Sequence, residues 1–195
     1  MLMTVEEYLA YPSIEGVTME LVRGELRMSP SPGNPHGSAI ARLVVLLANY
    51  VDPLRLGRVF GDGTGYELLQ LPRTVRIPDA SFVRADRIPA RGLGPDIFKF
   101  APDLAVEVLS PTNRASALQE KIDDYRVSGT TLIWVVDPIR RTVVSMANDA
   151  AERLLHEGDV LTGGRVLPDF SCDVAQIFDG IARDLEYGDD EFEPT

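Results

Sequence analysis

The sequence predicts a single α/β domain, and three observations support that prediction. The residues that follow the proline-rich segment 29–35 have the spacing of one apolar helix stripe, formed by Ile40, Leu43, Val44, Leu47 and Val51. Residues 104–109 and 132–136 are apolar runs separated by a helical segment, which is a strand–helix–strand order. With 195 residues, 45% of them hydrophobic, the chain is long enough to bury one sizeable core.

The first third of the chain predicts a short helix and a β-hairpin ahead of the long helix. Thr4 and Glu7 match a capping box, so the short helix should begin there and end at about Tyr11. Residues 19–28 read as two short strands around a glycine turn. Residues 29–35 fit neither a helix nor a central strand, because proline lacks the backbone donor that both need.

The remaining two thirds of the chain predict mainly strands. Residues 104–109 are apolar on both faces apart from Glu107, which is typical of a central strand covered on both sides. Residues 84–102, rich in proline and glycine, should be irregular. The other expected elements are strands at 58–60, 65–71, 79–83, 132–136 and 142–146, a helix at 115–128, further short β segments and a last turn at 174–178.

The acidic residues are concentrated at the end of the chain. The net charge is −11, which argues against a general nucleic-acid binder, because phosphate contacts need clustered Lys or Arg. Six acids follow the last basic residue, Arg183, and removing their charges from −11 leaves −5. We therefore expect one domain over residues 1–183 and an acidic, solvated and disordered tail over residues 184–195.

The sequence also restricts the compartment and the kind of metal site. The acidic N-terminus lacks the features of a secretory signal, and charges interrupt the apolar stretches before the roughly 20 residues of a membrane span. We expect a cytoplasmic protein with no membrane partner. Since Cys172 is the only cysteine, a metal here would need oxygen or histidine ligands.

Glu107 is the most informative residue, because a carboxylate in an apolar strand loses its hydration unless a positive group meets it. Strand alternation puts Ala105, Glu107 and Leu109 on one face. Glu107 also lies near the carboxyl end of the strand, where open α/β sheets place their ligands. We interpret it as a functional acid, and the alternative is a buried ion pair with an arginine.

Lys121 is the candidate positive group, on the helix that follows the strand of Glu107. It shares a helix face with Leu118, Ile122 and Tyr125, and that face should pack on the sheet. Only two of the 19 basic residues are lysines, Lys99 and Lys121. A lysine is a compact charge that can lose its proton when buried, whereas a guanidinium cannot. The alternative is a lysine at the helix edge with its amine in solvent.

Asp79 is the candidate second acid. Pro78 before it cannot donate to a sheet ladder and so marks a strand start or a bulge. From there Asp79 could reach across a neighbouring strand to Glu107. Two carboxylates at one point repel each other unless a proton or a divalent cation lies between them, and oxygen ligands favour Mg²⁺ or Mn²⁺. The alternative is a turn residue.

Six ordered motifs connect these candidates. They are ELVRGE at 20–25, Ser29-Pro30 with His36, Ile77-Pro78-Asp79, PDLAVEVLSP at 102–111, Lys121 with Tyr125, and WVVDP at 134–138. Together they resemble the Uma-two family of restriction-endonuclease-like proteins, within the PD-(D/E)XK nuclease superfamily. The resemblance extends from about Thr4 to about Gly180.

The resemblance implies a restriction-endonuclease-like, mixed central β-sheet flanked by helices, with additional β-hairpins. It also implies that Asp79 and Glu107 are the metal-binding acids. The superfamily lysine normally stands two residues after the second acid, where this chain has Leu109. Lys121 matches a lysine that has moved to the following helix.

Two further residues match the family at the beginning of the chain. Glu20 resembles an additional catalytic acid on an early element, and the alternative is an exposed hairpin residue. His36 matches a histidine common in the family, for which we assign no role, and capping or packing is the alternative. Nearby arginines are candidates for phosphate contacts or are solvated surface residues, namely Arg73, Arg76, Arg84, Arg87, Arg91 and Arg114.

These residues predict a metal-dependent endonuclease that hydrolyses DNA phosphodiester bonds. Asp79 and Glu107 would hold Mg²⁺ or Mn²⁺, which polarises the phosphodiester and lowers the pKa of a bound water. Lys121 would orient that water or stabilise charge in the transition state. DNA is the expected partner, and a homodimer is considered because duplex cleavage needs two cuts. The alternatives are a catalytically inactive nuclease-fold interaction module, which the acidic composition favours, and an acid-pair glycosidase, which leaves Lys121 without a role.

Overall fold

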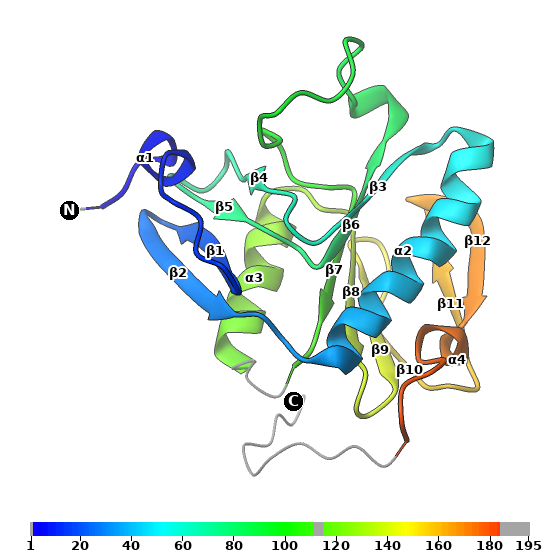
Figure 1. Ribbon diagram of the computed structural model, residues 1–195. Helices are drawn as coiled ribbons and strands as arrows, with labels where there is room; N and C mark the ends of the chain where they lie inside the picture. Colours follow the sequence, from blue (N-terminus) through cyan, green and yellow to red (C-terminus); the bar gives the residue numbers. More distant parts are fainter. Residues whose placement is uncertain (1, 111–114, 184–195) are drawn as a thin grey trace.

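A six-stranded sheet forms the centre of the protein in a computed structural model that describes residues 2–110 and 115–183 (Figure 1). The strand order is β10-β9-β8-β7-β6-β3. β7 and β8 are parallel, and the other neighbours are antiparallel, so the sheet is mixed as the resemblance implied. The strands are β3 Gly57–Gly61, β6 Ala80–Arg84, β7 Leu104–Val108, β8 Leu132–Asp137, β9 Thr142–Ala147 and β10 Arg153–Leu155.

Two smaller antiparallel sheets accompany the central sheet. The first has the order β2-β1-β5-β4 and contains the expected hairpin, in which Leu21 pairs with Leu26 across a turn at Arg23 and Gly24. The second is the pair β11–β12. The bounds are β1 Val17–Val22, β2 Glu25–Pro30, β4 Tyr66–Glu67, β5 Val75–Arg76, β11 Val160–Gly163 and β12 Leu167–Asp173.

The helices begin and end near the expected positions. Thr4 caps the first helix through the expected capping box with Glu7. Figure 1 shows β7 between the two long helices, α2 and α3. The bounds are α1 Val5–Leu9, α2 Asn34–Leu54, α3 Ala115–Val127, α4 Val174–Ile177 and a 3-10 turn, η1, at Ala85–Arg87.

The two faces of β7 contribute to two apolar clusters, as the alternation predicted. Leu104, Val106 and Val108 pack with the buried stripe of α2. Ala105 and Leu109 pack with residues of α3 on the other face. Side chains that alternate along an extended strand point to opposite faces of the sheet. Glu107 therefore faces the α3 side.

α2 is the one helix among the described residues that is long and apolar enough to cross a membrane by length and composition. The sequence interpretation did not identify it as such. In this fold Leu43, Leu47 and Val51 are fully buried against the central sheet. The apolar stripe of α2 is thus part of the protein core.

The strand expected at 79–83 runs from Ala80 to Arg84, so Asp79 lies just before it, and three other boundaries differ more from the prediction. The expected strand at 65–71 pairs only over Tyr66 and Glu67, because the chain then turns back through Arg73, whose φ is 51°, into β5. α2 begins at Asn34 rather than after Pro35. A proline in the first helical turn costs nothing, since the backbone donor it lacks would have no helical partner there. β2 extends to Pro30, at a sheet edge where a strand tolerates proline.

The expected acidic tail, 184–195, lies outside the described residues.

Candidate functional site

Register in the central sheet brings Asp79 and Glu107 together. β6 and β7 are antiparallel, with Ala80 opposite Val106, so Asp79, directly before β6, lies beside Glu107. The backbone N–H of Val108 donates to Oδ2 of Asp79 at 2.6 Å, which ties Asp79 to β7. Asp79 is therefore bonded across the sheet. The alternative interpretation, a turn residue, required hydrogen bonds within its own turn instead.

Lys121 and Tyr125 reach Glu107 from α3. Nζ of Lys121 donates to Oε2 of Glu107 at 2.7 Å, and the hydroxyl of Tyr125 donates to Oε1 at 2.9 Å. Nζ also donates to the backbone carbonyl of Ile77 at 3.2 Å. The side chain of Lys121 is 18% exposed, so it is not an edge lysine that extends into solvent. Among the described residues, the cation paired with Glu107 is this lysine and not an arginine.

Glu20 joins the same cluster from β1. Its Oε1 accepts from the backbone N–H of Ile77 at 2.7 Å and lies 3.3 Å from Nζ of Lys121. Its Oε2 accepts from Arg76 at 3.0 Å. The side chain of Glu20 is 12% exposed, which excludes the alternative of an exposed hairpin residue. Glu20 therefore fixes both Lys121 and the segment that precedes Asp79.

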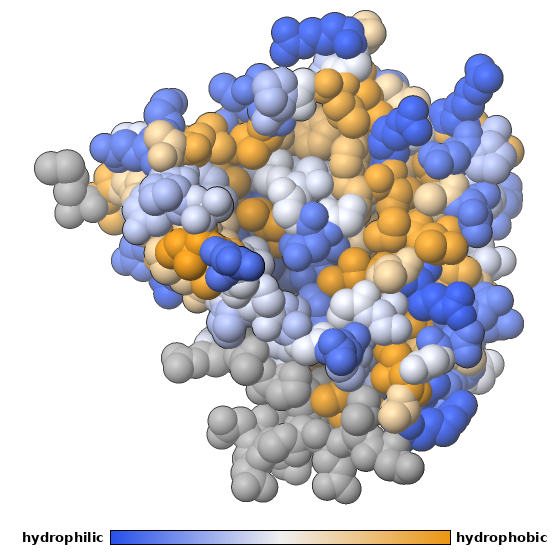
Figure 2. Space-filling model, viewed as in Figure 1, coloured by the Kyte–Doolittle hydropathy of each residue, from blue (hydrophilic) through white to orange (hydrophobic). Residues whose placement is uncertain are grey.

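His36 reaches the site from the first turn of α2. It is buried, and its Nε2 lies 3.2 Å from Oδ2 of Asp79. All five residues selected from the sequence are thus brought together from four elements and the segment before β6. Figure 2 shows that the surface is hollowed between the β1–β2 hairpin and α2, with hydrophilic residues on the floor of the hollow.

The structure adds Asp124 to the site, and it gives Arg76 and Tyr125 contacts there that the sequence interpretation did not predict. Nε and Nη2 of Arg76 donate to Oδ2 of Asp124 at 2.8 and 2.6 Å, and both side chains are almost fully buried. The buried pair connects β5 to α3 and leaves Nη1 of Arg76 free to bind Glu20. Arg76 is therefore neither a phosphate contact nor a surface residue. Its place within the apolar run Val75–Arg76–Ile77 was the available signal.

Four of the other arginines named from the sequence, Arg73, Arg84, Arg87 and Arg91, lie outside this cluster. Arg84 and Arg87 form ion pairs with Asp86 and Asp103, and Arg73 and Arg91 are exposed. Arg114 lies outside the described residues. Their contacts give no further positive charge to the acids of the site.

Burial and neighbouring charges shift the protonation equilibria of the cluster. Burial, together with the carboxylates of Asp79 and Glu20, raises the pKa of Glu107 to about 8, although Lys121 acts against this shift. Burial lowers the pKa of Lys121, but the attraction of the carboxylates of Glu107, Glu20 and Asp79 is stronger than this effect. The pKa of Lys121 is therefore raised above its ordinary value. Lys121 is therefore an ammonium at neutral pH. The three carboxyl groups repel one another around this ammonium, and the raised pKa of Glu107 reflects that repulsion together with burial.

The donor set fits a divalent cation that retains water ligands. Among the described residues, no group of three or more His, Cys, Asp and Glu side chains is placed to hold a metal ion. Mg²⁺, however, needs only one or two protein carboxylates and completes its shell with water and substrate phosphate. Within the described ranges, the N–H of Val108 and Nε2 of His36 both lie against Oδ2 of Asp79, which leaves Oδ1 available, and the side chain of Asp79 is 18% exposed. Asp79 and Glu107 can thus serve as the two carboxylates.

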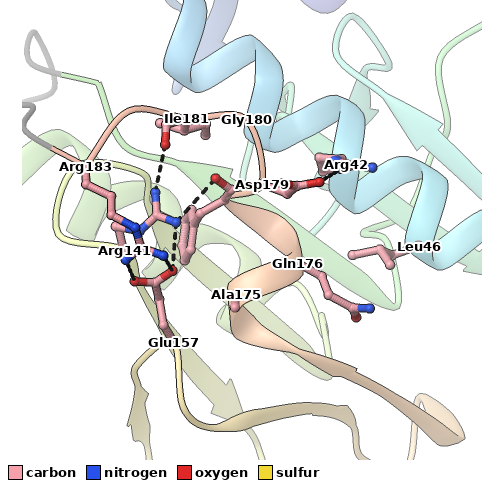
Figure 3. Close-up of a pocket in the computed structure, with 11 residues that line it drawn as sticks. Arg42, Leu46, Arg141, Glu157, Ala175, Gln176, Asp179, Gly180, Ile181 and Arg183 are labelled. Atoms are coloured by element: carbon pink, nitrogen blue, oxygen red, sulfur yellow. Dashed lines mark hydrogen bonds and ion pairs between the residues drawn. The ribbon is translucent and has the colours of Figure 1, made fainter.

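The protein also has a cavity of about 510 Å³ that none of these residues lines (Figure 3). It lies beside α2 and α4, and its charged lining consists of arginines paired with acids. Arg141 and Arg183 each donate to Glu157 at 2.7 Å, and Arg42 pairs with Asp179. These pairs satisfy one another, so this cavity lacks the excess of acid found beside Glu107.

Replacing Glu157 with glutamine is expected to lower the melting temperature at neutral pH. The difference in melting temperature from the wild type should become smaller in acid. Hydrogen bonds from Arg141 and Arg183 lower the pKa of Glu157 to about 2. A depressed folded-state pKa stabilises the protein above the ordinary value of 4.5, and this stabilisation is lost as the pH falls from 4.5 toward 2. Thermal unfolding of both proteins between pH 7 and pH 3 measures the difference, and a constant difference would contradict the expectation.

Comparisons with known proteins show the family and agree with the fold. The Uma2 family model, described as "Putative restriction endonuclease", matches residues 5–175. The fold is similar to a crystal structure described as "a putative nuclease belonging to DUF820" from Anabaena variabilis, with a TM-score of 0.78 and 23% identity over 90% of this chain and 97% of that chain. No curated protein matches the sequence. Because the family model spans most of the sequence, the chain belongs to the Uma2 family.

Proposed function

We propose that this protein is a metal-dependent nuclease that cleaves phosphodiester bonds within DNA. The observation that carries the proposal is the convergence of Asp79, directly before β6, and Glu107, in the neighbouring strand β7, beside the ammonium of Lys121. Repulsion between such neighbouring acids is relieved by a proton, as the raised pKa of Glu107 indicates, or by a divalent cation, and a DNA phosphate approaching the site needs positive charge as well. Membership of the family supports the nuclease class.

Asp79, through Oδ1, and Glu107 would hold Mg²⁺ or Mn²⁺. The metal, when bound, supplies Lewis-acid polarisation of a phosphoryl oxygen and lowers the pKa of a bound water. Lys121 keeps its proton and places a fixed positive charge at the edge of the site, where charge grows on the phosphoryl oxygens in the transition state. Tyr125 keeps the carboxylate of Glu107 in place by donating to Oε1.

The proposal is tested by incubating the purified protein with supercoiled plasmid and with single-stranded DNA, each in Mg²⁺, Mn²⁺ and EDTA. We expect cleavage with a metal and none in EDTA. Exchange of Asp79 for asparagine should reduce the cleavage rate by at least about 10²-fold, because the carboxylate that holds the metal loses its charge. Asp123, an exposed aspartate on α3, gives the matched control Asp123→Asn.

Two outcomes would contradict the proposal. Equal cleavage by wild type and the Asp79 variant would indicate a contaminating nuclease. Absence of cleavage with both substrates and both metals would favour the alternative of an inactive interaction module. A circular, covalently closed substrate distinguishes an endonuclease from an exonuclease, because only an endonuclease can cut a molecule without ends.

A further inference from the structure

His36 is a polar residue in an apolar helix face. The buried residues of α2 are His36, Ala39, Leu43, Leu47 and Val51, which form one stripe along the helix. His36 is 7% exposed, almost as buried as its apolar neighbours. Burial of an imidazole without a hydrogen bond is costly, so a partner must offset the lost hydration. Packing alone does not account for a histidine at this position.

The partner of His36 is Asp79. Nε2 of His36 lies 3.2 Å from Oδ2 of Asp79, the same oxygen that accepts the backbone N–H of Val108 at 2.6 Å. An ionised carboxylate only accepts hydrogen bonds, so an imidazole that carries its hydrogen on Nε2 is the form that stabilises Asp79 at this distance. Two groups thus approach one oxygen of Asp79: the N–H of Val108, which comes from β7 and donates to it, and the imidazole of His36, which comes from α2.

We propose that His36 is a positioning residue that holds Asp79 with Oδ1 directed at a divalent cation. The inference rests on the proposed function, because it concerns the metal that Asp79 would bind. Asp79 precedes β6 and follows Pro78, so it lies outside the paired strand. The contact of His36 with Oδ2 adds a second restraint on the orientation of its carboxylate, beside the hydrogen bond from Val108. Hydrogen-bond partners of metal-binding carboxylates orient their ligands in this way.

Two variants separate hydrogen bonding from packing. His36→Gln keeps an N–H donor at nearly the distance of Nε2, whereas His36→Leu keeps apolar volume and removes the donor. The exposed His156, the other histidine of the chain, provides the control His156→Gln. Titration calorimetry with Mn²⁺ and with Mg²⁺ would measure metal binding to the full chain. Thermal melts in EDTA would measure the stability of each variant.

We expect His36→Leu to weaken metal binding by about 10- to 100-fold. His36→Gln and His156→Gln should bind metal nearly as tightly as wild type. Rescue of metal affinity by glutamine is the decisive result. Glutamine has an N–H donor and leucine has none, and a role of the imidazole in packing alone would not make metal affinity depend on that donor.

Three results would overturn the proposal. Wild-type affinity in His36→Leu would show that Asp79 needs no support, while the proposed metal site would stand. Equal weakening in the leucine and glutamine variants, with lowered melting temperatures in EDTA, would assign His36 to packing. Absence of metal binding by the wild type at millimolar concentrations would overturn both this proposal and the proposed function.

Discussion

Exchange of Lys121 for methionine is expected to reduce DNA cleavage by about 10²- to 10³-fold, the loss that follows removal of one charge-stabilising donor from an active site. Among the described residues, Lys121 supplies the positive charge that contacts Glu107, and methionine retains the unbranched shape without that charge. Single-turnover rates on plasmid measure the effect. Lys99, the other lysine of the chain, is exposed and gives the control Lys99→Met.

The Lys121 variant should remain folded. With a pKa of about 8, the carboxyl of Glu107 is protonated near pH 6, so removal of the lysine leaves no unpaired buried charge on it there. Circular dichroism and a thermal melt should therefore resemble those of the wild type near pH 6. Cleavage at the wild-type rate by a folded Lys121→Met protein would show that the lysine has no part in the reaction.

Replacement of Glu107 should separate stability from activity. Alanine removes the acceptor of both Lys121 and Tyr125, and should lower the free energy of unfolding by about 3 kcal/mol, the lower end for a broken buried pair. We expect the lower end of that range because the amine of Lys121 keeps its ion pair with Glu20 and its hydrogen bond to the carbonyl of Ile77. Glutamine keeps an acceptor and relieves repulsion among the acids, so it should fold well and cleave no DNA. Urea unfolding and plasmid cleavage measure the two effects, and an active glutamine variant would contradict the expectation.

The wild type in EDTA should lose stability as the pH rises. A carboxyl whose folded-state pKa is about 8 binds a proton that the unfolded chain releases near 4.5, so the folded state binds more protons between these values. The free energy of unfolding then falls with increasing pH over that range. The Glu107→Gln protein lacks this group and should show a smaller slope in the same melts.

The secondary structure and the faces of the elements followed from local patterns. The hairpin, α2, α3 and the central strand β7 lie close to the predicted positions, because period-2 and period-3.6 patterns reflect which side of an element is buried. The short length of β4 and the existence of β5 did not follow. Their pairing depends on a turn and on strands distant in the sequence.

What the sequence by itself determined was that Glu107 stands in an apolar strand and that Lys121 shares the buried face of the next helix. Strand alternation and helix periodicity are sufficient for that inference. Only the tertiary structure decided the partners: Asp79 with Val108 and His36, and Arg76 with Asp124 and Glu20. These contacts join residues far apart in the chain, and they depend on strand register and on which helix covers which face. Periodicity along one element determines the direction of a side chain, whereas the packing of separate elements determines what it meets.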